Sequence, residues 1–296
     1  MEIKEFGEVI AREVKSALGA EYLTDYQDVT KNNGVIYHAI TIRKKDENIA
    51  PTIYIDRMFE KYERGAVLSG IVDDVLGMYR QSVPRKDMDI DFFYDFSKVS
   101  DKLFYKVVNY KKNKEKLKEV PIKRVLDLAI VPLCLYQNEQ IGNGSITIQN
   151  SHLKVWEITK EELWENVSEN APRVAPPKIK DLMDFIAKMT GQQNDLEDFC
   201  GMYVLTNEGE NFGAGSILYP GLLKGIADDH ECDLFIIPSS VHECIIIPDA
   251  AFAMDTDSMR EIIREVNRTA LAEEDILSDN LYMYDRENDR FFVVKE

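Results

Sequence analysis

The feature that most constrains how this chain can fold is the segment DLFIIPSSVHECIIIPD, residues 233–249. It contains two runs, residues 234–237 and 244–247, that are apolar at every position, and each run is followed by a proline. Short apolar runs joined by a few polar residues predict a β-hairpin. Because strands that are apolar on both faces are buried on both, we expect this hairpin at the centre of a sheet.

The segments around the hairpin predict the rest of that sheet and its helices. Apolar residues at helical spacing predict helices at residues 221–229 and 258–268. Ser258 and Glu261 have the spacing of a capping box at the start of the second helix. Further strands are predicted at residues 202–206, 281–284 and 291–294. The expected order is therefore strand, helix, two strands, helix, two strands.

The first half of the chain also alternates between predicted helices and strands. Apolar residues every four positions predict an N-terminal helix that ends near Gly19. The other patterns predict strands at residues 35–43, 52–55, 102–110, 125–135 and 145–149, and helices at residues 57–63, 67–80 and 160–169. Asn150 and His152 are expected at the end of the last of these strands.

The segment between the two halves contains several prolines. In chain order the sequence predicts a short linker marked by Pro172, Pro176 and Pro177, a helix at residues 179–189 and a polar loop at residues 191–198. We therefore expect an α+β protein of two abutting lobes, each an antiparallel or mixed sheet with packed helices. The expected domains are residues 1–120, and residues 121–296 with the hairpin at their centre.

The charge of the chain bears on its partners. The formal net charge is -17 over 296 residues. Direct nucleic-acid binding is not expected, because neutralising phosphates needs clustered Lys and Arg. The acidic balance instead allows an inhibitor that mimics nucleic acid. The one basic concentration, residues 111–124, is typical of a solvated helix or loop, and the alternative is a docking patch for an acidic partner.

The cysteines and the N-terminus bear on where the protein works. Cys134, Cys200, Cys232 and Cys244 are widely spread, and three of them lie in or beside apolar runs. This arrangement indicates reduced, buried thiols and a reducing compartment. The first residues have no apolar core of a signal peptide, and no stretch approaches the roughly 20 apolar residues of a membrane span. We expect a cytoplasmic protein that does not contact a membrane.

Two repeats look like halves of a zinc site: His230-Glu231-Cys232 and His242-Glu243-Cys244. If the hairpin turn is centred on Ser240, Cys244 lies opposite Ile236. Cys232 then lies four residues further along that strand, roughly 13 Å away at about 3.4 Å per residue. Zinc ligands lie about 2.0–2.3 Å from the metal. The two halves therefore cannot share one ion.

Two other motifs are incomplete. Alternating aspartates at residues 87–91 resemble the start of a calcium-binding loop, but the sixth and twelfth positions, Phe92 and Lys98, are not the required Gly and Glu. The glycines within residues 213–215 lie between a predicted strand and a helix, yet they lack the remaining residues of either phosphate-binding fingerprint. We therefore expect no metal and no cofactor.

The densest group of reactive side chains is Ser240, His242 and Glu243 in the hairpin turn. A serine, a histidine and a carboxylate are the ingredients of nucleophilic catalysis. In an extended segment the Cβ atoms of Ser240 and His242 would be roughly 7 Å apart, too far for the bond of about 3 Å that base activation needs. The alternative is a structural turn whose side chains bond to the local backbone.

A second polar and aromatic cluster is formed by Asn150, His152 and Trp156. Its aromatic ring is a candidate ligand platform, and the alternative is that Asn150 caps or turns the chain while Trp156 belongs to the core. These three residues are the second candidate ligand-binding site.

Several segments together resemble a known family: KNNG, APTIYID, VVNYKKNKEKL, LDLAIV, NSHLKVWEITKEELW, MYVLTNEGENFGAGSILYP, IIPSSVHE and LSDNLYMYDR. The resemblance is to uncharacterised proteins of anaerobic gut Firmicutes that are known only as a domain of unknown function. It covers nearly the whole chain and implies a cytoplasmic bacterial protein. It implies no activity, cofactor or catalytic residue.

No catalytic motif is complete, so we expect a non-enzymatic binding or protein-interaction module with an unknown protein partner. One alternative is a hydrolase-like enzyme in which Ser240 is the nucleophile and His242 the base, with Glu243 beside them. The other alternative is the acidic mimic of nucleic acid. The sequence leaves the oligomeric state open.

Overall fold

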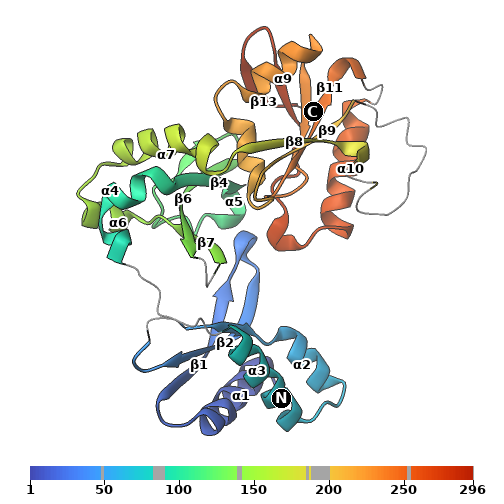
Figure 1. Ribbon diagram of the computed structural model, residues 1–296. Coiled ribbons are helices and arrows are strands. Elements are labelled where there is room, and N and C mark those ends of the chain that lie inside the picture. The colour runs from blue at the N-terminus through green and yellow to red at the C-terminus, as the bar shows by residue number, and fades with distance from the viewer. Residues whose placement is uncertain are drawn as a thin grey trace. The chain divides into compact units, whose positions relative to one another are not determined.

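The computed structural model describes residues 1–47, 50–82, 91–138, 142–184, 187, 201–251 and 255–295. The fold is α+β, as predicted, with helices packed on antiparallel sheets. By its internal contacts the chain forms two compact units (Figure 1). Unit 1 is Met1–Asp91 with Gln137–Asn143, and unit 2 is Phe92–Tyr136 with Gly144–Glu296. The boundary expected near residue 120, between two abutting lobes, stays a prediction.

Unit 1 is a three-stranded antiparallel sheet with one face covered by helices. Its elements are α1 (Ile3–Leu18), β1 (Tyr22–Thr30), the 3₁₀ helix η1 (Asn32–Gly34), β2 (Ile36–Lys44), β3 (Thr52–Tyr54), α2 (Asp56–Glu63) and α3 (Leu68–Ser82). The buried cluster between helices and sheet includes Phe6, Ile10, Val14, Ile40, Ile42, Met58, Ile71 and Val75. The predicted N-terminal helix ends at Leu18 with Gly19 as its C-cap, as expected.

Strand β1 was not predicted from the sequence. Its residues, YLTDYQDVT, show no run of apolar positions, and none of them is fully buried. The strand nevertheless pairs with β2 along its whole length, from Tyr22 opposite Lys44 to Thr30 opposite Ile36. Backbone pairing with the apolar β2 therefore decides the conformation of this segment, because a strand at a sheet edge needs little burial of its own side chains.

Unit 2 contains two antiparallel sheets, and the first is formed by residues 103–147. In it β6 lies between β4 and β5, and β7 also pairs with β6. The elements are β4 (Leu103–Asn109), β5 (Lys123–Val125), β6 (Leu128–Asn138) and β7 (Gly142–Thr147). The helices of this part are η2 (Asp91–Tyr94), α4 (Phe96–Val99), η3 (Ser100–Lys102), α5 (Tyr110–Asn113), α6 (Asn150–Trp156) and α7 (Lys160–Val174).

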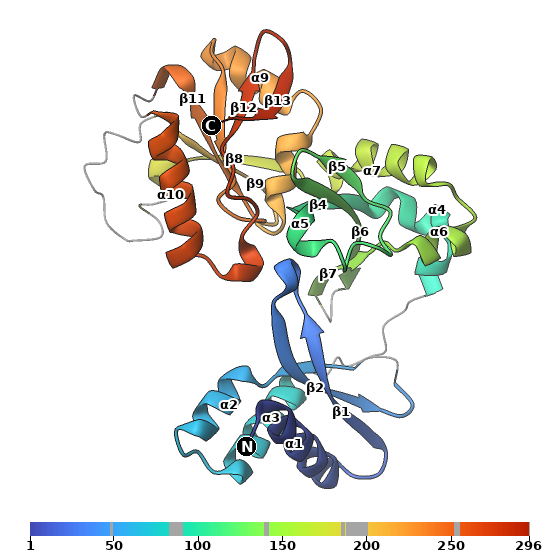
Figure 2. The same cartoon turned by 180° about the vertical axis from the view of Figure 1, so that it is seen from behind.

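The second sheet of unit 2 has six strands in the order β13-β12-β10-β11-β9-β8 (Figure 2). They are β8 (Pro177–Asp181), β9 (Tyr203–Asn207), β10 (Leu234–Ile237), β11 (Cys244–Pro248), β12 (Tyr282–Asp285) and β13 (Arg290–Val293). The connecting helices are η5 (Gly213–Leu218), α9 (Leu222–His230), η6 (Asp249–Ala251), α10 (Thr256–Thr269) and η7 (Glu273–Asp275). The hairpin β10–β11 occupies the two central positions, as predicted.

Both faces of the central hairpin are covered, which explains why its strands are apolar at every position. Phe235 and Ile247 pack with Met259 and Ile263 of α10 on one face. On the other face, Ile236 and its neighbours join the larger core that also holds residues of η5, α9 and the first sheet, including Leu234, Cys244, Ile246, Ala214, Ile217, Leu223 and Val107. The hairpin therefore lies at the centre of the core of unit 2.

The predicted register of the hairpin is wrong. Ile236 lies opposite Ile246 rather than Cys244, so the turn is centred on Val241 instead of Ser240. Val241 is only 3% exposed, and its N–H donates to the carbonyl of Asp275 at 2.8 Å. The burial of Val241 and this hydrogen bond favour the turn that points Val241 inward. The apolar pattern of the strands alone did not distinguish this register from the one with Cys244 opposite Ile236.

Two predictions near the middle of the chain are also wrong. Asn150 and His152 do not end a strand, because β7 ends at Thr147 and they lie in the first turn of α6. The predicted linker begins inside a helix, since α7 continues through Pro172 with Ala171 fully buried. Tertiary packing of the helix outweighs the local cost of the proline.

The segment predicted as a helix at residues 179–189 begins as a strand. Residues of β8 pair antiparallel with β9, for example Ile179 opposite Leu205. Free backbone groups at the edge of β9 outweigh the helical spacing of the apolar residues. The loop predicted at residues 191–198 lies outside the described residues. The cap of α10 is also different from the prediction, because Asp255 accepts the N–H groups of Asp257 and Ser258.

Candidate functional site

The turn at residues 238–243 was the main sequence candidate for chemistry. Ser240 is only 5% exposed, and its hydroxyl oxygen accepts the backbone N–H of His242 at 3.0 Å. The Ser240 N–H donates to the carbonyl of Glu243 at 3.0 Å. Burial raises the pKa of Glu243, while Lys180 and His242 oppose that shift. These contacts are those of a tight turn whose serine side chain bonds to local backbone.

The imidazole of His242 has partners at both nitrogens. Its Nδ1 accepts the backbone N–H of Phe212 at 3.2 Å. Since that nitrogen must then carry a lone pair, the neutral ring has its proton on Nε2, which lies 3.3 Å from Oδ1 of Asp275. In this arrangement neither nitrogen is placed to accept the proton of the Ser240 hydroxyl. The three candidate residues are therefore neighbours without the hydrogen bond that activates a nucleophile.

Phe212 connects this turn to the loop after β9. Its ring stacks on that of His242, with centroids 5.6 Å apart and planes at 14°. The backbone of Phe212 has φ 58°, a conformation that is uncommon and strained for a bulky side chain. Such strain persists only when surrounding contacts hold it in place.

The contacts that hold Phe212 come from the end of β9. The side-chain amide of Asn207 donates to the carbonyl of Asn211 at 2.8 Å and accepts the Asn211 N–H at 3.2 Å. The Thr206 hydroxyl donates to the carbonyl of His242 at 2.8 Å. Both Thr206 and Asn207 are buried. The loop is thus fixed on both sides of Phe212.

Gly213 allows this loop to approach the hairpin. A Cβ at this position would lie 2.3 Å from Oγ1 of Thr206, 2.5 Å from N of Asn207 and 2.7 Å from O of His242. Only a residue without a side chain fits there. The glycines of residues 213–215 therefore serve close packing, and the helix after them begins at Leu222 with Gly221 as its first flanking residue.

Lys106 completes the cluster from the first sheet. It lies on β4, and its Nζ is 4.4 Å from the centroid of the Phe212 ring. Burial, and to a lesser extent the charge of Lys116, lowers the pKa of Lys106 to about 8. We call Lys106, Phe212, His242 and Asp275 the Phe212 cluster. All four residues belong to unit 2.

Sequence reasoning missed three members of the Phe212 cluster: Lys106, Phe212 and Asp275. One signal was present, because Lys106 is the only charged residue within the strand LFYKVVN, whose other residues are mostly buried. A charge inside an apolar strand is costly and indicates a special role. Nothing in the sequence indicated that this strand lies beside the loop after β9.

The second sequence candidate is partly assembled. The rings of His152 and Trp156 both contact Phe93, at 4.9 and 5.2 Å between centroids. Their polar atoms bond to the backbone: Trp156 Nε1 donates to the carbonyl of Phe93 at 2.7 Å, and His152 Nδ1 accepts the Gln149 N–H at 3.0 Å. Burial lowers the pKa of His152. These contacts are those of an aromatic core.

Asn150 does not join that aromatic group through its side chain. Its amide donates to the carbonyl of Lys118 at 3.5 Å, and its backbone N–H donates to the carbonyl of Glu119 at 2.8 Å. It therefore fixes the start of α6 against the loop before β5.

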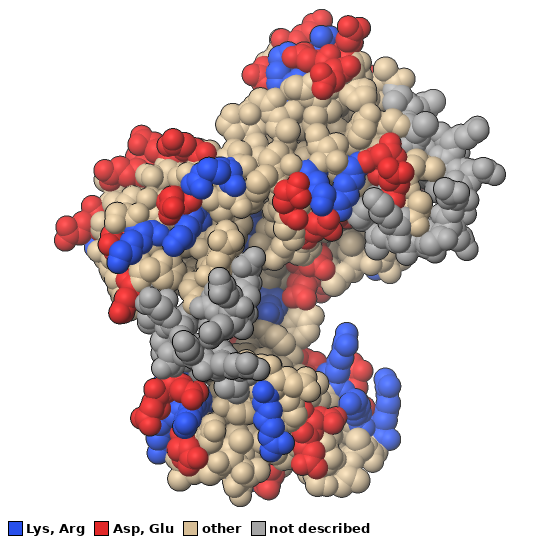
Figure 3. Space-filling view, viewed as in Figure 1, with Lys and Arg blue, Asp and Glu red and all other residues tan. Residues whose placement is uncertain are grey.

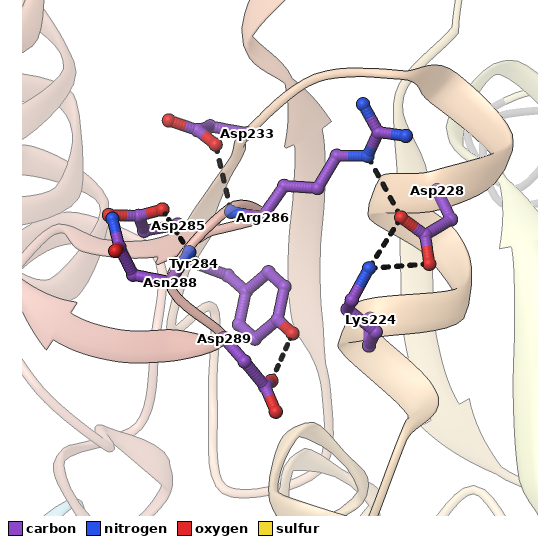
Figure 4. A network of polar contacts seen from close by, with 8 residues as sticks. All are labelled: Lys224, Asp228, Asp233, Tyr284, Asp285, Arg286, Asn288 and Asp289. Carbon is purple, nitrogen blue, oxygen red and sulfur yellow. Dashed lines mark hydrogen bonds and ion pairs between the residues drawn. The ribbon is translucent and has the colours of Figure 1, made fainter.

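A network of charged residues joins the β12–β13 hairpin to α9 (Figure 4). Asp228 accepts from Arg286 Nε at 2.8 Å and from Lys224 Nζ at 2.6 Å. The backbone N–H of Arg286 donates to Asp233 at 2.9 Å, and the Tyr284 hydroxyl donates to Asp289. The ion pairs are partly exposed, so they position the hairpin and contribute little to stability.

The metal-binding motifs considered from the sequence do not form sites. Their residues either lie on different elements or lie outside the described residues. His230 ends α9 and its ring contacts Tyr203, whereas His242 lies in the β10–β11 turn. Among the residues that the structure describes, no group of three or more His, Cys, Asp or Glu could hold a metal ion. Of the aspartates within residues 87–91, Asp87 and Asp89 lie outside the described residues, as does Cys200.

The surface and the helices bear on the expected partners. In the view of Figure 3, Lys and Arg lie among Asp and Glu, and the visible face has no continuous acidic stripe. The basic segment at residues 111–124 is largely exposed, with Arg124 over the ring of Tyr110 and Lys123 over that of Trp164. None of the described helices has the length and apolar character that crossing a membrane requires.

The comparisons with known proteins give a family but no function. The model of a family of unknown function, DUF5688, matches residues 3–286. No curated protein and no solved structure matches the chain.

Proposed function

Since the chain belongs to the DUF5688 family of unknown function, we propose that it is a non-enzymatic binding protein in which the 238–243 turn is structural. The observation that carries this proposal is the engagement of both ring nitrogens of His242, by the Phe212 N–H and by Asp275. A general base needs a free lone pair within reach of the proton that it removes. The imidazole of His242 uses its lone pair to fix the backbone of Phe212.

The role of His242 in this proposal is to position a binding surface. The ring supports Phe212 in its strained conformation, and Phe212 in turn contacts Lys106. An aromatic ring beside a partly buried ammonium is a combination used in ligand recognition. Strained residues held by buried polar contacts are found preferentially at functional sites. The Phe212 cluster is therefore the part of unit 2 that we assign to binding.

A hydrolase is the second candidate, favoured by one specific contact. The carboxylate of Asp275 lies 3.3 Å from Nε2 of His242, and a carboxylate orients the histidine of many hydrolases. For catalysis, Ser240 would have to exchange its bond with the His242 N–H for one with the imidazole. The enzyme would therefore require a different arrangement of this turn.

The setting that we propose is the cytoplasm of a bacterium, with a protein partner. Cys134, Cys232 and Cys244 are free thiols, which supports a reducing compartment. Burial raises the pKa of Cys134 to about 12, so this thiol is protonated and unreactive at neutral pH. The resemblance of the sequence supports bacterial origin in gut Firmicutes. The acidic mimic of nucleic acid is less well supported, because charges of both signs are mixed on the face that Figure 3 shows.

Hydrolysis assays test the proposal. We expect purified protein to hydrolyse neither p-nitrophenyl acetate nor p-nitrophenyl phosphate above the rate of buffer. Steady turnover that is lost in both Ser240→Ala and His242→Ala, and kept in the control His230→Ala, would establish the hydrolase instead. His230 is a suitable control because it lies at the end of α9, where its ring contacts Tyr203, and it is not part of the Phe212 cluster. Affinity capture from the native cell would then identify the partner.

A further inference from the structure

We infer that Lys106 is the anchor of a binding site for a small oxyanion, a carboxylate or a phosphate, beside Phe212 in unit 2. The inference deepens the proposed function, since it assumes that the Phe212 cluster binds its ligand without cleaving it. The site comprises Lys106 on β4, Phe212 before η5 and His242 in the hairpin turn.

The first argument is that Lys106 is a cation without a counter-ion. Among the described residues, no Asp or Glu forms an ion pair with its ammonium, and its contact is with the Phe212 ring. Taking an unpaired charge out of water costs free energy that a strand position with an apolar residue would avoid. A bound anion would supply the missing charge. Lys106 as a whole is only partly buried, so the residue is in contact with solvent.

A comparison with another lysine shows what is particular to Lys106. Lys123 also lies over an aromatic ring, 5.0 Å from the centroid of Trp164, but Lys123 is exposed. Water therefore solvates the ammonium of Lys123 and no ligand is needed there. Lys106 is half-buried in a strand whose other residues are mostly buried.

The second argument is independent of charge and concerns the backbone of Phe212. Its positive φ is held by the Asn207 side chain and by the bond to His242. Gly213 beside it cannot be replaced by a larger residue without a clash. Several buried groups thus maintain one costly conformation, and its result is to hold the Phe212 ring against the Lys106 ammonium.

The charges around the cluster select the size of the anion. Lys116 acts on Lys106 with the same sign, which adds to the attraction for an anion. Glu273 and Glu274 of η7 are the chain neighbours of Asp275, the partner of His242. These carboxylates would repel a long polyanion such as nucleic acid. A small carboxylate or phosphate carries less charge and is repelled less.

The test is calorimetric titration of the full chain with inorganic phosphate, acetate and succinate at constant ionic strength, with choline chloride as the control salt. We expect at least one oxyanion to bind and choline chloride to give no signal. Lys106→Met should weaken binding about tenfold or more, because a charge-assisted hydrogen bond is lost. Lys106→Arg should restore part of it. The matched control Lys123→Met should change the affinity less than about twofold.

The outcomes separate the two proposals. Equal affinity in Lys106→Met and the unaltered protein would overturn the oxyanion site, as would failure of all the oxyanions to bind a protein that hydrolyses nothing. In both of these cases the non-enzymatic reading of the turn stands. Hydrolysis that depends on His242 overturns the proposed function itself. A thermal melt of each variant checks folding, and loss of binding in a folded Lys106→Met together with recovery in Lys106→Arg supports the site.

Discussion

The backbone N–H of Phe212 donates to Nδ1 of His242 at 3.2 Å while the two rings stack at 14°. One residue belongs to the loop after β9 and the other to the turn between β10 and β11. The contact therefore joins two connections at the same end of the central sheet. The lone pair of the imidazole is used to hold the backbone of Phe212. For this reason we interpret the 238–243 turn as structural.

Two substitutions of His242 separate the hydrogen bond from the stacking. His242→Phe keeps a ring but removes the acceptor, which leaves the Phe212 N–H without its partner. We expect it to lower the free energy of unfolding by about 1–3 kcal/mol. His242→Asn keeps an acceptor close to the position of Nδ1 and loses the ring, so it should cost less. Urea unfolding measures both, and a larger loss for the Asn variant would contradict this account.

The close approach at Gly213 predicts a sharp effect of one methyl group. Gly213→Ala would place a Cβ within 2.7 Å of the His242 carbonyl and nearer still to Thr206 and Asn207. We expect a loss of about 1–3 kcal/mol, as for overpacked cores. The control is Gly225→Ala on α9, where a Cβ meets nothing within 4 Å. Alanine there should stabilise the helix by about 0.5–1 kcal/mol. Equal unfolding midpoints for the two variants would contradict the packing argument.

Lys106 predicts a dependence of stability on pH. Its pKa falls from the ordinary 10.5 to about 8 in the folded protein, through burial and the charge of Lys116. Between these two values the unfolded chain holds more protons, so this residue makes the folded state more stable as pH rises. At pH 7 Lys106 is charged in both states, and the folded state bears the full free-energy cost of burying the ammonium.

Lys106→Met should therefore be more stable than the unaltered protein at pH 7, by at most about 3 kcal/mol. Partial exposure and loss of the contact with Phe212 reduce this gain. The advantage of the variant should decrease from pH 8 to 10.5. Thermal melts at several pH values measure it, with Lys123→Met as the control that should show no such trend. The stability of Lys106→Met minus that of the unaltered protein should be larger at pH 7 than at pH 10. The opposite order would contradict the predicted sign.

The parts of the fold that the sequence predicted correctly have strong, local patterns. The strands of the β10–β11 hairpin are apolar at every position because both of their faces are buried, by α10 on one side and by the larger core on the other. The predicted helix at residues 160–169 is present as α7, and Thr159 and Glu162 form a capping box at its start. In these segments local preference and tertiary packing favour the same structure.

The site could not be predicted, because its residues come together through tertiary contacts. Ser240, His242 and Glu243 were noticed because they are neighbours in the sequence, but the partners of His242 are Phe212 and Asp275. Which loop lies beside which strand depends on the sheet order, and no single-sequence pattern gives that order. The same reason explains β8, whose strand conformation is imposed by the edge of β9.

A partly buried carboxylate, Asp127, links the two sheets of unit 2 and gives a last prediction. Asp127 accepts the hydroxyl of Tyr282 at 2.8 Å and that of Ser278 at 2.7 Å. Tyr282 is fully buried, and burial together with the charge of Asp127 raises its pKa. Tyr282→Phe leaves one oxygen of Asp127 without its donor. We expect a loss of about 1–3 kcal/mol at pH 7, and a coupling to Ser278→Ala in a double-mutant cycle.

The sign of the pH effect at Tyr282 is opposite to that at Lys106. Because the folded state keeps the phenol neutral, its contribution is complete below the ordinary pKa of 10 and is lost as pH rises above that value. The difference in stability between the unaltered protein and Tyr282→Phe should therefore shrink above pH 10. Tyr203→Phe is the control, because the Tyr203 ring contacts His230 and its hydroxyl has no hydrogen bond to a described residue. A constant difference across this range would contradict the raised pKa of Tyr282 in the folded protein.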